Sequence, residues 1–240
     1  MAARRVNPKR NSGNTKSKGG IPAPTVRRLS LYLRQLESLW RADQHTVSSR
    51  QLGEALRLTD TQIRKDLAYF GQFGHPGIGY DVAELTTRIR RILGTDRTWN
   101  VLLVGAGNLG SALSAYRGFA RKGFKLVAVL DVDPRKIGKP IPSNPELIVQ
   151  PFSDVAKIVK QKDIRLAINA VPAEAAQEVA ATLAQAGVLG LFNFAPVNLD
   201  VASNVAVSTV DLAVQLEQLS FRVGTRQTLG ESASALSEEV

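Results

Sequence analysis

The sequence predicts an α/β protein with two folded parts, a winged helix-turn-helix domain and then a Rossmann-like domain built on a parallel sheet, followed by one more helix. Three observations lead to this prediction. Two short helices with capping signals, joined by a three-residue turn, lie within residues 48–70. An apolar run leads directly into the pattern Gly-x-Gly-x-x-Gly at Gly105–Gly110. Strand-like and helix-like segments then alternate up to residue 209, which is typical of a parallel sheet with right-handed crossovers.

The formal net charge of +10 over 240 residues is unevenly distributed. Residues 1–20 hold six Lys/Arg and no acid, residues 21–94 hold eleven against seven acids, and residues 95–240 hold fourteen of each. A basic first half joined to a neutral second half is expected of a nucleic-acid-binding domain fused to a ligand-binding one. We therefore expect a disordered basic tail at 1–20, a winged-helix domain at 21–94, a Rossmann-like domain at 95–209, a C-terminal helix at 210–223 and a flexible tail at 224–240.

Two absences exclude whole classes of function. The chain has no Cys, which excludes disulfides, thiolate catalysis and cysteine metal sites, so any redox role must come from a bound cofactor. No segment approaches the ~18 apolar residues of a membrane span, and the basic N-terminus lacks the apolar core of a secretory signal. We expect no membrane partner and a cytoplasmic location.

Residues 25–70 predict three helices, the first beginning at Thr25. The second runs from Ser48 to about Leu56 and the third from Thr59 to Phe70, each opening with the spacing of a capping box. The outward face of the third helix is narrow, polar and basic, and consists of Thr61, Gln62, Arg64, Lys65 and Ala68. Such a face can enter a major groove, where Gln and Arg bind base edges and Lys binds phosphate.

The glycine-rich stretch Gly71–Tyr80 suits the tight hairpin of a wing beside this third helix, and a linking helix is expected at Val82–Leu93. The alternative for the helical region alone is a small bundle with an ordinary solvated face, because basic helix faces are common. The wing and the local charge surplus favour DNA binding.

The glycine pattern at residues 105–110 predicts a dinucleotide site. Gly105 would allow the tight turn, Gly107 would let backbone amides approach a pyrophosphate, and Gly110 would let a helix at 109–121 pack closely. The next strand ends in Asp131, 21 residues after Gly110, where such folds place the carboxylate that binds the adenosine ribose. This acid favours NAD over NADP. The expected cofactor-binding residues here are Gly105, Ala106, Gly107, Asn108, Leu109, Gly110 and Asp131.

Further strands are expected at residues 125–130, 147–150, 166–171, 188–192 and 205–208, with helices near 154–160 and in the alanine-rich stretch that ends at Gly187. Ligands bind beyond the carboxyl ends of such strands, so the exits Asn169–Pro172 and Asn193–Pro196 are expected to flank a nicotinamide. The contacts expected there are Ala170, Val171, Pro172, Asn193, Ala195 and Pro196. The last helix, Leu212–Val223, either completes this domain or crosses to a partner subunit.

A dehydrogenase needs a proton donor or acceptor beside the transferred hydride. The only two histidines, His45 and His75, lie in the N-terminal half, and Tyr116 near the glycine turn has no Lys at the spacing that would acidify it. The cofactor site is therefore predicted without a catalytic site. We expect the chain to sense a dinucleotide and not to turn it over.

The sequence resembles the Rex family of bacterial redox-sensing transcriptional repressors over about residues 21–223. The resemblance rests on Arg64–Leu67 with the glycine wing that follows, on Gly105–Gly110, and on Asn193–Pro196. It implies a homodimer that exchanges its C-terminal helix, binds a palindromic double-stranded DNA operator when NADH is scarce and releases it when NADH binds, with NADH and NAD⁺ as the sensed ligands.

The resemblance also implies roles for single residues. Arg64 and Lys65 would contact DNA, Tyr116 would line the nicotinamide side, and Asp211 would join an intersubunit contact that differs between states. Together with the residues above, the expected DNA-binding set is Arg28, Ser48, Ser49, Thr61, Gln62, Arg64, Lys65 and Gly77.

Two other classes of function stay open at this point. One is an NAD-dependent oxidoreductase, which consumption of NADH with a carbonyl substrate would reveal. The other is a CoA-binding protein, since the second half also resembles CoA-binding domains of acyl-CoA ligases. Competition between CoA and NADH would distinguish a CoA-binding protein from an NADH sensor.

Overall fold

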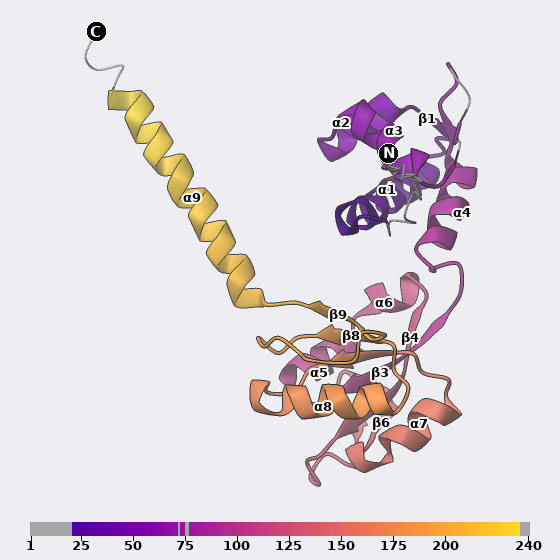
Figure 1. The fold of residues 1–240 in the computed structure, drawn as a ribbon, viewed down its shortest axis with the longest axis vertical. Coiled ribbons are helices and arrows are strands. Elements are labelled where there is room, and N and C mark those ends of the chain that lie inside the picture. Colours follow the sequence, from indigo (N-terminus) through magenta and orange to yellow (C-terminus); the bar gives the residue numbers. More distant parts are fainter. Residues whose placement is uncertain (1–20, 72, 75–76, 236–240) are drawn as a thin grey trace, which may run out of the picture. The chain divides into compact units, whose positions relative to one another are not determined.

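The computed structural model describes residues 21–71, 73–74 and 77–235 (Figure 1), so the expected tail at 1–20 lies outside the described residues. The chain forms two compact units, Met1–Asp96 and Arg97–Val240, and each is described here by itself. The boundary falls two residues beyond the expected one.

The first unit is helical, with one small antiparallel sheet. Its elements are α1 (Ala23–Arg41), β1 (Thr46–Val47), α2 (Ser49–Leu56), α3 (Asp60–Ala68), β2 (Tyr80–Asp81) and α4 (Val82–Ile92). The apolar stripes of the four helices meet in one core, which includes the fully buried Leu29, Leu36, Ile63 and Ile89. This packing holds α2 and α3 together as the helix-turn-helix that the sequence predicts.

The capping signals are only partly realised. Ser48 and Gln51 form the complete reciprocal capping box at the start of α2. At the start of α3, Thr59 accepts from the backbone N–H of Gln62, but the Gln62 side chain does not return to the cap. Its amide is bound to Asp66 instead.

The strand pairing in this unit differs from a simple hairpin wing. β2 pairs with β1, which precedes α2 in the chain, so that Val47 lies opposite Tyr80. Residues 72 and 75–76 of the expected wing lie outside the described residues. Gly74, Gly77 and Gly79 all have positive φ, between +76° and +94°, which glycine adopts without steric cost.

The second unit carries a seven-stranded sheet in the order β5-β6-β4-β3-β7-β8-β9. The strands are β3 (Trp99–Val104), β4 (Phe124–Asp131), β5 (Pro140–Ile141), β6 (Asn144–Pro151), β7 (Leu166–Asn169), β8 (Gly190–Asn193) and β9 (Ala206–Thr209). Apart from the antiparallel edge strand β5, all pairs are parallel. Numbered along the chain, the six parallel strands run 3-2-1-4-5-6, the order of doubly wound dinucleotide-binding sheets.

Helices lie on both faces of this sheet (Figure 1). They are α5 (Asn108–Ser114), α6 (Arg117–Arg121), the 3₁₀ turn η1 (Phe152–Asp154), α7 (Val155–Gln161) and α8 (Ala173–Gln185). Leu102 and Val104 of β3 pack with α7 and α8, while Val101 and Leu103 pack with α5 and α6. Successive side chains of a strand point to opposite faces, so the continuous apolar run of β3 is what a strand buried on both faces requires.

Three features differ from the sequence prediction. The single helix expected at 109–121 is wrong: it is interrupted at Tyr116, whose extended backbone (ψ 98°) separates α5 from α6. The two-residue edge strand β5 was not predicted, because so short a strand shows no periodicity. The last helix, α9 (Leu212–Ala235), continues past the expected end at Val223.

Candidate functional site

The glycine turn after β3 uses its glycines in three different ways. Gly105 has φ +98°, and a Cβ there would lie 2.5 Å from the carbonyl oxygen of Ala170, so both conformation and space require glycine. A Cβ on Gly110 would lie 1.8 Å from the carbonyl oxygen of Gly105, so α5 packs directly on the turn. A Cβ on Gly107 would meet nothing within 4 Å. Of these three glycines, only Gly107 is not required by the packing of the protein itself. The space beside it is open to a ligand.

Asp131 lies at the end of β4 beside this turn, and its carboxylate is turned into the protein. Oδ2 accepts from the backbone N–H of Ala106 at 2.7 Å and from Nζ of Lys136 at 3.1 Å. Oδ1 accepts from the backbone N–H of Asp133 at 2.8 Å. With 8% of its surface exposed, Asp131 holds the glycine turn against the end of β4.

Burial raises the pKa of Asp131, but the hydrogen bonds from Asp133, Ala106 and Lys136 outweigh it and leave the pKa below its ordinary value. The carboxylate is therefore ionised at neutral pH. The cations nearby are paired: Lys136 with Asp131, and Arg135 with Asp133 at 2.9 Å. Hydrogen bonds from Arg135 lower the pKa of Asp133 to about 2. Arg135 and Lys136, the two cations that could favour the ribose 2′-phosphate of NADP, are therefore each paired with a carboxylate.

The residues that follow β7 and β8 lie at the carboxyl edge of the sheet, on the same edge as the glycine turn. The backbone N–H of Ala170 donates to Val104, and that of Phe194 donates to Asn169. Asn193 is fully buried and bonds to the backbone of Ala195 and Val197, so it shapes its own loop. The β7 exit therefore lies beside Gly105, at the point where the strand order reverses, and the β8 exit lies beside the β7 exit.

The remaining residues predicted in this site differ in accessibility. Gly107, Asn108, Leu109 and Pro196 are exposed, and Ala106, Val171 and Ala170 are half-buried, whereas Gly105, Gly110 and Ala195 are buried. Tyr116 is 60% exposed and packs edge-on against Phe119, at 5.0 Å between ring centroids. Asn169, which was not in the predicted contact set, is fully buried, and its Oδ1 has no hydrogen-bond partner among the described residues.

A surface hollow of about 680 Å³ lies between α2, α3 and the glycine-rich loop. Four of the predicted DNA-contacting residues line it: Ser48, Ser49, Arg64 and Gly77. The exposed guanidinium of Arg64 pairs with Asp60 at 2.8 Å and donates to Ser49 at 3.2 Å. A surface ion pair of this kind contributes only about 0–1 kcal/mol, so Arg64 can exchange it for a phosphate or a base at small cost. Thr61 and Lys65 are exposed on the same helix.

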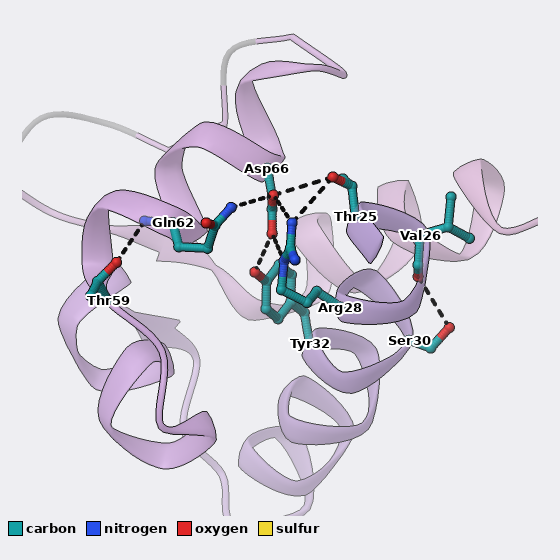
Figure 2. A network of polar contacts seen from close by, with 8 residues as sticks. All are labelled: Thr25, Val26, Arg28, Ser30, Tyr32, Thr59, Gln62 and Asp66. Carbon is teal, nitrogen blue, oxygen red and sulfur yellow. Dashed lines mark hydrogen bonds and ion pairs between the residues drawn. The ribbon is translucent and has the colours of Figure 1, made fainter. Parts of the chain in front are cut away.

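Arg28 and Gln62, also predicted to contact DNA, each bind Asp66 within the protein (Figure 2). Arg28 makes two hydrogen bonds to the carboxylate, at 2.5 and 2.7 Å, and the hydroxyl of Tyr32 donates a third at 2.6 Å. Asp66 is 1% exposed, so this network joins α3 to α1 inside the domain. Sequence reasoning missed Asp66, although a charge between Ile63 and Leu67 on the buried side of a helix is a signal that it must have a partner.

Asp211 precedes α9 and caps it. Its Oδ1 accepts from the backbone N–H groups of Ala213 and Val214, at 3.0 and 3.1 Å. Every described side chain from Leu212 to residue 225 is exposed, including those of Leu216 and Leu219. The apolar stripe of α9 therefore has no cover within this chain among the described residues.

Comparison with known proteins finds a matching family model in each of the two units. A family model described as "Putative DNA-binding protein N-terminus" matches residues 20–68, and one described as "CoA binding domain" matches residues 96–197. Fold and sites thus define a class of regulator in which a helix-turn-helix domain is joined to a nucleotide-binding sheet.

Relatives and solved structures narrow this class to one family. Redox-sensing transcriptional repressors Rex from Carboxydothermus hydrogenoformans and Desulforamulus reducens are 49% and 44% identical, over 85% and 86% of this chain and 96% and 97% of their own. The crystal structure of RSP, a Rex-family repressor, in complex with β-NAD⁺ and operator DNA matches with TM-score 0.81 at 36% identity, covering 88% of this chain and 96% of that one. RSP in complex with β-NADH matches with TM-score 0.79 at 34% identity, covering 89% and 99%. The chain belongs to the Rex family of redox-sensing transcriptional repressors.

Membership of this family makes the chain a DNA-binding regulator and not an enzyme, since its relatives are named as repressors. In the part of the chain that the structure describes, His, Asp and Glu nowhere gather into a group that could hold a metal ion. Over the same residues, no helix is both long and apolar enough to cross a bilayer.

Proposed function

We propose that this chain represses transcription by binding a palindromic operator through α3 when NADH is scarce, and that NADH bound at the glycine turn releases it. One observation carries the proposal: in a chain that also has a capped helix-turn-helix, Gly107, Asp131 and both strand exits lie along the carboxyl edge of the sheet, on neighbouring strands around the switch point between β3 and β7. Solved structures of RSP hold NADH, or NAD⁺ together with operator DNA. The cytoplasm, where NADH and DNA are both accessible, is the proposed location.

At the cofactor site, each group has a separate task. The open space beside Gly107 admits the pyrophosphate, and the negative charge of Asp131 at the end of β4 favours the adenosine ribose of NADH over one that carries a 2′-phosphate. The exits at Ala170–Pro172 and Asn193–Pro196 enclose the nicotinamide, with the exposed ring of Tyr116 on its other side. Because relatives of the chain are named as repressors and Tyr116 has no Lys at the spacing that would acidify it, the nicotinamide is bound and not reduced or oxidised.

The active form is proposed to be a homodimer held by exchanged α9 helices. One face of the sheet has an apolar hollow of about 390 Å³, lined by residues of β3, β4, β7, β8 and β9 together with Phe119. Leu216 and Leu219 of α9 are 68% and 50% exposed. An exposed apolar helix and an exposed apolar hollow in one chain are complementary when two copies meet, and the α9 of a partner is the occupant we propose.

NADH can release the operator only through different affinities for two states of the dimer. Dimeric helix-turn-helix proteins need their recognition helices about 34 Å apart to enter successive major grooves. To shift the dimer from 1:99 to 99:1 in favour of the state that does not bind DNA, NADH must bind that state about 10⁴-fold more tightly, a difference of about 5.5 kcal/mol. Asp211 is proposed to join the contact that differs between these states.

The test is fluorescence anisotropy of a labelled operator, titrated with NADH and separately with NAD⁺. Release by NADH at concentrations where NAD⁺ has little effect would support the proposal. CoA serves as the competitor, because the matched domain model is described as CoA-binding. Displacement of NADH by CoA, or DNA binding that ignores both dinucleotides, would contradict it.

A further inference from the structure

Gln62 lies half-buried on α3, and one of the two N–H groups of its side-chain amide is already bound. Nε2 donates to Oδ1 of Asp66 at 2.8 Å, one turn further along the helix. Asp66 is held in turn by Arg28 and Tyr32, so it cannot follow Gln62 outward without breaking buried hydrogen bonds. Figure 2 shows the amide nitrogen of Gln62 directed at Asp66 and the amide oxygen turned away from it.

The amide cannot be reversed in this setting. An ionised carboxylate accepts hydrogen bonds and donates none, so a reversed amide would set Oε1 of Gln62 against Oδ1 of Asp66. Burial raises the pKa of Asp66, but hydrogen bonds from Arg28, Tyr32 and Gln62 outweigh it and hold the pKa below its ordinary value. The carboxylate is therefore ionised at neutral pH, and the polarity of the Gln62 amide is fixed before any DNA binds.

This polarity limits which bases Gln62 can bind. A freely rotating Gln can accept from the amino group of adenine, and it can also turn its amide to donate to the acceptors of guanine or thymine. Asp66 takes one N–H of Nε2 and leaves the second free, but it prevents the amide from reversing, so a base that lies against Oε1 of Gln62 needs a donor. In the major groove only adenine N6 and cytosine N4 supply one, whereas guanine O6 and thymine O4 are acceptors.

We propose that Asp66 fixes Gln62 as a hydrogen-bond acceptor in the major groove, so that Gln62 selects a base with an exocyclic amino group, adenine or cytosine, over guanine or thymine. The inference rests on the proposed binding of an operator by α3. Asp66 is a positioning residue: it does not contact DNA but sets what the recognition helix can bind.

The test uses the full-length protein and an operator recovered from a random duplex pool by selection with the wild type. Each base pair of one half-site is replaced in turn, and binding is measured for the wild type and for Gln62→Met, which keeps the length of the side chain and removes its amide. A position that matters to the wild type and not to Gln62→Met is the one that Gln62 contacts. Gln62 is half-buried on the surface of α3, so the variant is expected to fold.

At that position, adenine is replaced by purine, which lacks the N6 amino group, or cytosine by 2-pyrimidinone, which lacks the N4 amino group. We expect the wild-type Kd to rise about tenfold and the Gln62→Met Kd to change less than about twofold. Any weakening of the base pair itself affects both proteins equally. Lys65→Met is the matched control on the same helix, and it is expected to weaken binding to every duplex by the same factor.

A positioning role has its own readout. Asp66→Asn leaves an amide that can donate or accept, so Gln62 regains the freedom to reverse, and the preference for an amino-bearing base over guanine at that position should fall about tenfold. The ratio of two Kd values is compared because a general loss of stability would change both alike.

Three results would overturn this inference and leave the proposed operator binding intact. They are tight wild-type binding to the amino-less duplex, a guanine or thymine at the contacted position, and base preferences that are identical in the wild type and in Gln62→Met. If the wild type recovers no duplex from the pool, the proposed operator binding fails, and this inference fails with it.

Discussion

Oδ2 of Asp131 accepts a 2.7 Å hydrogen bond from the backbone N–H of Ala106, which ties the end of β4 to the turn that follows β3. The carboxylate expected to bind a ribose is thus already part of the support of the turn. We propose that this single side chain has both tasks, because the ends of β3 and β4 are neighbours in the sheet and an acid there lies beside the turn that is expected to hold the ligand.

The first prediction separates these two tasks. Asp131→Asn keeps an oxygen that can accept from Ala106 but removes the charge that would repel the 2′-phosphate of NADPH. We expect the ratio of the Kd values for NADPH and NADH to narrow about tenfold, or about 1.4 kcal/mol, measured by titration calorimetry. Asp163→Asn, an exposed acid in the loop before β7, is the control and should leave the ratio unchanged. An unchanged ratio in Asp131→Asn would remove this residue from the ribose site.

The second prediction contrasts two glycines of the same turn. Gly107→Val places its side chain in open space, so the protein should fold with a nearly unchanged melting temperature, bind NADH at least tenfold more weakly and remain on the operator when NADH is added. Gly110→Ala would place a methyl group 1.8 Å from the carbonyl oxygen of Gly105, so this smaller change should destabilise the domain. Thermal melting and NADH titration of both variants check the contrast. Normal release by NADH in Gly107→Val would place the pocket elsewhere.

Local patterns account for what the sequence predicts correctly. The strand-turn-helix unit at Gly105, the helix-turn-helix and the strand exits each depend on residues close together in the chain, and their signals are turn chemistry and periodicity. Right-handed crossovers determine which face of the sheet each helix covers, but the order of the strands does not follow from these local patterns. The break at Tyr116 shows the limit. An isolated glycine such as Gly118 is tolerated in a helical pattern, so it does not predict a break. The ring of Tyr116 lies over Gly118, where a Cβ would come within 2.4 Å, and this contact cannot be read from a local pattern.

The partners of Arg28 and Gln62 could not be predicted in the same way. Asp66 meets Arg28 across 38 positions of the sequence, and that contact depends on how α1 packs on α3. A basic residue and an amide on polar helix positions are typical of DNA-binding faces, so both were assigned to DNA. Their roles at the operator stay predictions, but the structure shows that each already has a buried partner.

The third prediction concerns stability at low pH. The folded-state pKa of Asp66 lies below its ordinary value of about 3.9. Its stabilising contribution is therefore complete above that value and is lost as pH falls through the folded-state pKa. Asp66→Asn leaves Arg28 without its counter-charge and should cost about 3 kcal/mol near neutral pH, with a smaller loss at pH 3. Urea unfolding at both pH values tests this, and an equal loss at both would exclude the charge as the cause.

The fourth prediction concerns the exchanged helix. Leu216→Glu places a charge in the apolar stripe of α9, which should prevent its burial in a partner and give a monomer that still binds NADH. Gln218→Glu, on another face of the same helix, adds the same charge and should remain a dimer. Light scattering after size exclusion gives the mass of each. A dimeric Leu216→Glu would contradict the exchange of α9.

The last prediction tests whether α3 binds the operator by removing the positive charge of Arg64. Arg64 is paired only with surface groups, so Arg64→Ala should change stability by less than about 1 kcal/mol, while the loss of a base or phosphate contact should weaken operator binding about tenfold. Arg165→Ala removes the same charge from an exposed ion pair in the other unit and should leave operator binding within about twofold. Anisotropy measures the Kd for the operator, and calorimetry measures the Kd for NADH. The Kd for NADH should not change in either variant. Loss of NADH binding in Arg64→Ala would indicate unfolding, and an unchanged operator Kd would exclude Arg64 from the interface.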